Sequence, residues 1–93
     1  MKRKSAAKEA ARIRPVHVRV KGRFRVGLMG SAETERSMGI AHIELSTDDV
    51  VFAHHRDFEP PELHGELRDG DVVGLEIGRD AKGRRALRIR RRA

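Results

Sequence analysis

Apolar and charged residues alternate along the chain from Val16 onward, and this pattern predicts a β-strand with one buried face. One parity is apolar apart from Gly22 and contains Val16, Val18, Val20, Phe24, Val26 and Leu28. The other parity is polar and contains His17, Arg19, Lys21, Arg23 and Arg25. Gly22 and Gly27 fall where so long a strand can bend or bulge, as a strand of a small closed barrel must.

Four further strands are predicted after the first, each bounded by turn residues. They cover residues 39–45, 50–54 and 71–77 and a last strand that contains Ala86, Leu87 and Ile89. Residues 30–36 are predicted to form a polar hairpin loop, and residues 56–68, which include Pro60 and Pro61, one longer irregular connection. Five short strands with a longer connection after the third predict an all-β, five-stranded barrel of the oligonucleotide-binding (OB) fold.

Positive charge is concentrated at the two ends of this 93-residue chain, whose formal net charge is +7. Residues 1–14 hold six Lys or Arg and one Glu, and residues 79–93 hold eight Lys or Arg and one Asp. Residues 15–78 instead have seven basic and twelve acidic residues. We therefore expect a flexible basic arm at residues 1–14, a folded domain at 15–90 and a basic tail at 91–93. Basic arms around a folded centre favour binding to nucleic acid, and neither arm has the apolar face of a membrane-surface helix.

Other chemistry finds little support in the sequence. The chain has no cysteine, which excludes disulfides and thiolate metal sites. His54 and His55 are adjacent and are expected on opposite faces of a strand, and His17 and His64 are expected to be exposed, so we predict no metal or cofactor. Phosphate-loop and nucleophile motifs are missing, which favours a binding protein over an enzyme. With no apolar run of membrane-spanning length and no apolar stretch of a secretion signal, we expect a cytoplasmic protein.

Three stretches of the chain resemble sequence motifs of one protein family. Residues 39–43 (GIAHI) stand where that family has a Gly-aromatic-Gly-aromatic-Ile motif, and residues 51–55 (VFAHH) are similar to its Val-Phe-Val-His-Phe motif. Residues 67–77 and then 82–89 are similar to its last two strands. Residues 22–90 thus resemble the cold-shock domain, a five-stranded OB barrel of bacterial and other proteins, although Ile40 and His42 replace both aromatic residues of the first motif. The C-terminal part also resembles bacterial initiation factor one and the S1 domain, which are OB barrels too.

The resemblance implies that the protein binds single-stranded RNA or DNA, with bases stacked on outward side chains and basic residues along the backbone. If Ala41 and Val51 face inward, alternation places Phe52 outward, whereas a register shifted by one residue would bury it. The candidate binding residues combine the outward faces of the first three strands with the basic last strand. They are Arg19, Lys21, Arg23, Arg25, Ile40, His42, Phe52, His54, His55, Arg88 and Arg90. One phenylalanine offers little stacking surface, so we expect affinity to depend steeply on salt.

A second hypothesis is a protein-interaction module. The acidic middle of the chain would dock on a larger assembly such as the ribosome or RNA polymerase and regulate it, with Phe58, Pro60, Pro61 and Leu63 as contacts. A monomer is expected, although an exposed Phe52 beside Ile40 would also suit a dimer face.

Overall fold

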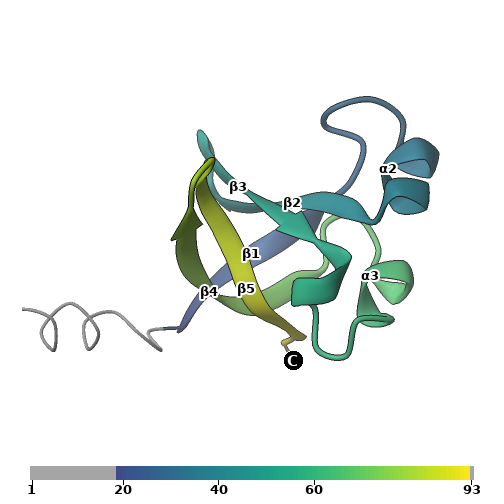
Figure 1. The fold of residues 1–93 in the computed structure, drawn as a ribbon. Helices are drawn as coiled ribbons and strands as arrows, with labels where there is room; N and C mark the ends of the chain where they lie inside the picture. The colour runs from purple at the N-terminus through teal and green to yellow at the C-terminus, as the bar shows by residue number, and fades with distance from the viewer. Residues whose placement is uncertain (1–18, 93) are drawn as a thin grey trace, which may run out of the picture.

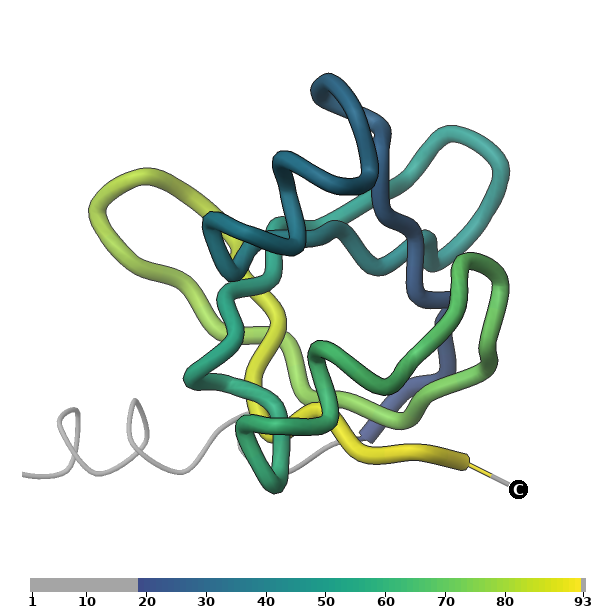
Figure 2. The backbone as a smooth tube through the Cα atoms, turned by 90° about the vertical axis from the view of Figure 1, so that its right-hand side faces the viewer, coloured from purple at the N-terminus to yellow at the C-terminus, as the bar shows by residue number. Residues whose placement is uncertain are grey.

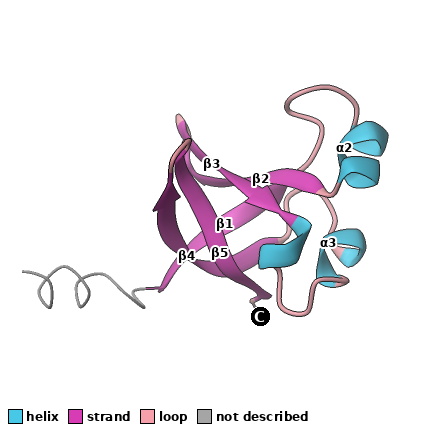
Figure 3. Ribbon diagram, viewed as in Figure 1, coloured by secondary structure: helices cyan, strands magenta, loops and turns pink. Residues whose placement is uncertain are grey.

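The structure, a computed structural model, describes residues 19–92. The predicted arm at residues 1–14 therefore lies outside the described residues. Five strands form the body of the fold: β1 (Arg19–Arg25), β2 (Ile40–Ser46), β3 (Asp49–His54), β4 (Val72–Asp80) and β5 (Gly83–Arg91). Three short helices lie in the connections: α2 (Ala32–Met38), η1 (His55–Asp57) and α3 (Leu63–Glu66) (Figure 3). None of the helices within this part of the chain is long and apolar enough to span a membrane.

The strands close into a barrel with the order β1-β2-β3-β5-β4, and β4 pairs back onto β1 (Figures 1 and 2). Neighbouring strands are antiparallel except β3 and β5, which run parallel where Phe52 lies opposite Arg85. The closed five-stranded barrel confirms the predicted fold class. Its strand order is compatible with the OB fold.

Alternation along the first three strands follows the predicted register. Phe24 in β1, Ala41 in β2 and Val51 in β3 are buried, because the pleat of a strand turns successive side chains to opposite faces. Phe52 faces outward with 39% of its surface exposed, so the shifted register that would bury it is not adopted. The prediction is wrong at Leu28, which is 45% exposed. β1 ends at Arg25, and the chain then turns away through Gly27, whose φ is +94°.

The connection at residues 55–71 closes one end of the barrel. The rings of Phe24 and Phe58 meet edge to face at 5.9 Å, and the ring of His64 packs against both. Only 5% of His64 is exposed, and its Nε2 lies 3.0 Å from the carbonyl oxygen of Ile40. The sequence prediction of an exposed His64 is therefore wrong. The same correction applies to Phe58 and Leu63, which are core residues and not surface contacts for a partner.

The predicted hairpin loop at residues 30–36 is also wrong, because these residues form most of helix α2. Ser31 caps the helix by accepting a hydrogen bond from the Thr34 N–H (3.0 Å), and Gly39 ends it in the left-handed conformation (φ 72°). Arg36 donates hydrogen bonds to the carbonyl oxygens of His64 and Leu67, which joins α2 to the neighbourhood of α3. A capped helix that is held by the barrel needs little propensity of its own.

A bulge in β5 breaks the alternation near the end of the chain. Gly74 lies opposite Arg90 but Glu76 lies opposite Leu87, so β5 contains one extra residue between these pairs. Arg88 takes a φ of 46° at this point. The extra residue lets Ala86 and Ile89, three positions apart, both point into the core.

Candidate nucleic-acid interface

A row of outward side chains crosses four strands of the barrel in register. Arg25 in β1 lies opposite His42 in β2, His42 opposite Phe52 in β3, and Phe52 opposite Arg85 in β5. The rings of His42 and Phe52 meet edge to face, with centroids 6.0 Å apart and an interplanar angle of 78°. Since the ring of Phe52 is exposed, this row presents one aromatic surface between cationic side chains.

A groove of about 540 Å³ opens beside Phe52, between β3 and the β4–β5 hairpin. We call it the Phe52 groove; it is lined by Phe52, His54, Arg56, Asp80, Ala81, Lys82, Arg84 and Arg85. The hairpin reaches this position because β4 runs to Asp80 and pairs there with Gly83 across a tight turn. An exposed aromatic ring, an imidazole and four cationic side chains therefore share one concave surface.

The turn that follows β3 brings His55 beside His54. The rings of His54 and His55 lie 4.5 Å apart and are tilted by 36°, so the prediction that they point to opposite faces is wrong. β3 ends at His54, and η1 then bends the chain so that His55 lies over Gly39. A Cβ at Gly39 would come within 2.5 Å of His55 Cδ2, so this packing requires glycine.

His54 is held as a neutral imidazole. Burial, followed by the charges of His55 and Arg56, lowers the pKa of His54 below its ordinary value. Its Nδ1 also accepts a hydrogen bond from the backbone N–H of Arg56 (3.3 Å), which an imidazolium could not do. At neutral pH the side chain thus presents a flat, uncharged ring to the groove.

Two of the four cations of the groove are already paired with carboxylates. Arg84 pairs with Asp49, and Arg85 pairs with both Asp57 and Asp80. By contrast, Arg56 and Lys82 form no ion pair with any acidic side chain among residues 19–92. Hydrogen bonds from the backbone N–H of Lys82 and from Arg85 hold the pKa of Asp80 below its usual range, so Asp80 is ionised.

The fold does not bring all of the binding residues predicted from the sequence together at one site. Phe52 and His54 line the groove, His42 packs edge to face against Phe52, and Ile40 lies opposite His54 on the neighbouring strand. His55 stacks on His54 outside the groove lining. Four of the candidate arginines instead form ion pairs with carboxylates of the barrel: Arg19 with Glu76, Arg25 with Glu44 and Asp69, Arg88 with Glu59 and Glu76, and Arg90 with Glu59.

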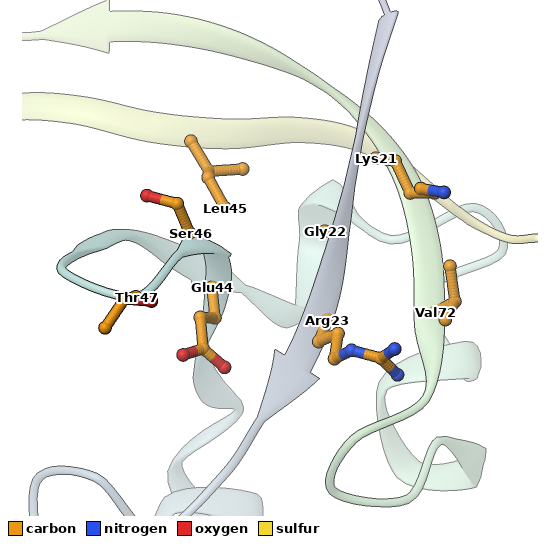
Figure 4. A pocket seen from close by; sticks show the side chains of 8 residues that line it. All are labelled: Lys21, Gly22, Arg23, Glu44, Leu45, Ser46, Thr47 and Val72. Carbon is orange, nitrogen blue, oxygen red and sulfur yellow. The ribbon is translucent and has the colours of Figure 1, made fainter.

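Lys21 and Arg23 line a second, smaller hollow of about 300 Å³ between β1 and the β2–β3 hairpin. In Figure 4 their side chains extend on the β4 side of β1, whereas Ser46 and Thr47 lie across the hollow. The hollow opens where β2 bulges between Glu44 and Ser46. It is separate from the Phe52 groove, with which it shares no lining residue.

Sequence reasoning missed the four cations of the groove, Arg56, Lys82, Arg84 and Arg85. The cluster of Lys82, Arg84 and Arg85 was visible as charge, but only the parallel pairing of β5 with β3 brings it to Phe52. Such a contact between strands distant in sequence leaves no local signal.

Within residues 19–92, no group of three or more His, Asp or Glu side chains is arranged to hold a metal ion. No protein-family model matches the chain, and a search of curated proteins finds no match.

Proposed function

We propose that the protein binds single-stranded RNA or DNA in the Phe52 groove, as a small OB-fold binding protein of cold-shock-like type with no catalytic activity. The observation that carries the proposal is the joint presence of an exposed Phe52 and four cationic side chains in one groove. Stacking on an aromatic ring contributes about 1–3 kcal/mol per base, and it requires a base that is not already stacked in a duplex.

The two walls of the groove are suited to different parts of the ligand. A base stacks on Phe52, with the neutral ring of His54 as a second flat surface, while phosphates lie toward the β4–β5 hairpin. Lys82 and Arg56 are suited to phosphate contacts because neither is engaged by a carboxylate of the described chain. Such contacts hold the backbone without reading sequence, so we expect weak base specificity.

The test is fluorescence anisotropy of labelled single-stranded RNA, single-stranded DNA and duplex of matched length, titrated with Phe52→Ala and wild-type protein. We expect single strands to bind best and Phe52→Ala to weaken them about tenfold or more, since a factor of ten corresponds to about 1.4 kcal/mol of stacking. The duplex, whose bases are already stacked, should respond little.

Val50→Ala is the matched control. Val50 lies on the same strand and the same outward face, is 43% exposed, and does not line the groove. It should leave affinity within about twofold of wild type, because surface truncations away from a contact cost little. Equal affinity for all three ligands, or equal effects of the two substitutions, would refute groove binding by stacking.

A second candidate function is docking on a larger assembly such as the ribosome or RNA polymerase. The observation that favours it is the exposure of Leu28 and Met29 on a loop that the buried carboxylate of Glu35 holds in place. A protein that binds no oligonucleotide in the titration above, but whose loop amides are protected when ribosomes or polymerase are added, would belong to this class.

A further inference from the structure

The carboxylates around the Phe52 groove point to a role in choosing the ligand. We propose that Asp80, supported by Asp49 and Asp57, determines specificity by rejecting ligands that bind through phosphates alone, so that single strands are favoured over duplexes. This inference rests on the proposed function and names the residues that set its selectivity.

Asp80 is fixed in the groove by two different groups. Its Oδ1 accepts a hydrogen bond from the backbone N–H of Lys82 (2.8 Å), and its Oδ2 pairs with Arg85 at 3.2 Å. The side chain is 41% exposed and is part of the groove lining. A carboxylate that the hairpin turn holds in this way stays in the path of an incoming phosphate.

Asp49 and Asp57 do not line the groove, but each pairs with an arginine that does. Asp57 pairs with Arg85 where both side chains are largely buried, and Asp49 pairs with Arg84 near the surface. Three carboxylates therefore accompany four cations, and His54 adds no charge while it is neutral. The groove is thus close to electrically balanced, although its lining looks strongly basic.

The near balance of charge determines which ligands bind well in the groove. Stacking on Phe52 does not depend on the ligand's charge, whereas attraction to the cations and repulsion from the carboxylates grow with the number of nearby phosphates. A duplex carries about one negative charge per 1.7 Å of its axis, so it meets the carboxylates with more charge than a single strand does. Specificity arises here from a repulsive element that acts against the wrong ligand.

The experiment measures the affinity of Asp80→Asn for single-stranded RNA and for duplex RNA of matched length at fixed salt. Asparagine keeps an oxygen that can accept from the Lys82 N–H, so the hairpin turn is preserved while one charge is removed. We expect single-strand affinity to rise up to about fivefold, the factor for one unit charge a few ångström away in water, and duplex affinity to rise by a clearly larger factor, because a duplex brings more phosphates near Asp80.

Glu62→Gln is the matched control, because it removes one exposed acidic charge at the residue that precedes α3. Figure 1 shows α3 at the other end of the barrel from the β4–β5 hairpin. It should raise both affinities equally and by less than about twofold. Circular dichroism of both variants confirms that the barrel is intact.

The outcomes separate this inference from the proposed function. If wild-type protein prefers single strands and depends on Phe52, but Asp80→Asn changes both affinities equally or not at all, the specificity role is refuted and groove binding stands. If wild-type protein shows no preference for single strands and no dependence on Phe52, the proposed function fails and the specificity role falls with it.

Discussion

Replacement of Glu35 by alanine is a direct test of how the β1–β2 connection is held. Glu35 is 2% exposed, yet each of its two carboxylate oxygens accepts a hydrogen bond from a backbone N–H group. Oε1 accepts from Gly27 (2.8 Å) and Oε2 from Met29 (2.7 Å). The Glu35 side chain therefore ties the loop that contains the exposed Leu28 and Met29 to helix α2, which follows that loop.

The expected destabilisation can be worked out from these hydrogen bonds. A hydrogen bond to a charged group contributes about 1.5–3 kcal/mol, and Glu35 makes two of them. Removing Glu35 also removes the cost of burying its charge, so we expect the free energy of unfolding to fall by about 2 kcal/mol. For a domain of this size that corresponds to a fall in Tm of about 8–16 °C.

Urea unfolding followed by circular dichroism measures this destabilisation, and hydrogen exchange locates it. The amides of Gly27 and Met29 should exchange faster in Glu35→Ala, since both lose their acceptor. Glu33→Ala, on the exposed face of the same helix, is the control and should stay within about 0.5 kcal/mol of wild type. A Glu35→Ala protein as stable as this control, or unchanged exchange at Met29, would refute the reasoning.

Three other predictions concern Gly39, His54 and the basic N-terminal residues. Gly39→Ala should lower the free energy of unfolding in urea by about 2–4 kcal/mol, because alanine disfavours a φ of 72° and its Cβ would overlap His55; a decrease under about 1 kcal/mol would contradict the packing. Because the pKa of His54 is lowered in the folded protein, the unfolded chain binds a proton below about pH 6.5, the ordinary histidine pKa, that the folded chain does not bind. The stability of the wild type should therefore fall more than that of His54→Gln, and urea midpoints of the two proteins that change in parallel between pH 7.5 and 5 would contradict this. Removal of residues 1–14 should reduce the slope of log affinity against log salt by about 0.7 for each phosphate that these residues neutralise, while the effect of Phe52→Ala in anisotropy stays the same; an unchanged slope would mean that these residues bind no phosphate.

Local patterns in the sequence predicted the barrel well where one face of a strand is buried along its whole length. β2 and β3 lie within one residue of their predicted bounds, because alternation and the turn between them are both readable. The helix α2 was missed because its seven residues contain no apolar face, and its stability comes from the cap at Ser31 and from the contacts of Glu35 and Arg36. Burial of His64 was missed for a similar reason, since nothing local indicates that a polar ring will close a barrel end.

The candidate site, too, could be predicted only where a local sequence pattern defines it. Phe52 and His54 could be placed on the outward face from parity alone, and the structure brings both to the groove. Arg84 and Arg85 could not be placed, because their neighbours are set by the parallel pairing of β3 with β5. Only after that pairing is known can one see that the groove includes Asp80 and that Asp49 and Asp57 pair with two of its arginines.

The spatial arrangement of charge also changes what the net charge of +7 means. The described residues 19–92 contain fifteen Lys or Arg and thirteen Asp or Glu, so the barrel itself is nearly balanced. In the sequence, the basic C-terminal segment is separate from the acidic middle. In the fold, β5 brings its arginines into ion pairs with carboxylates of that middle: Arg84 with Asp49, Arg85 with Asp57, and Arg90 with Glu59. A nearly balanced barrel exerts little long-range attraction, so the proposed affinity for nucleic acid would rest on short-range contacts such as stacking on Phe52. Under the proposed function, electrostatic steering of the nucleic acid would then fall to the remaining excess charge, which the sequence places in residues 1–18.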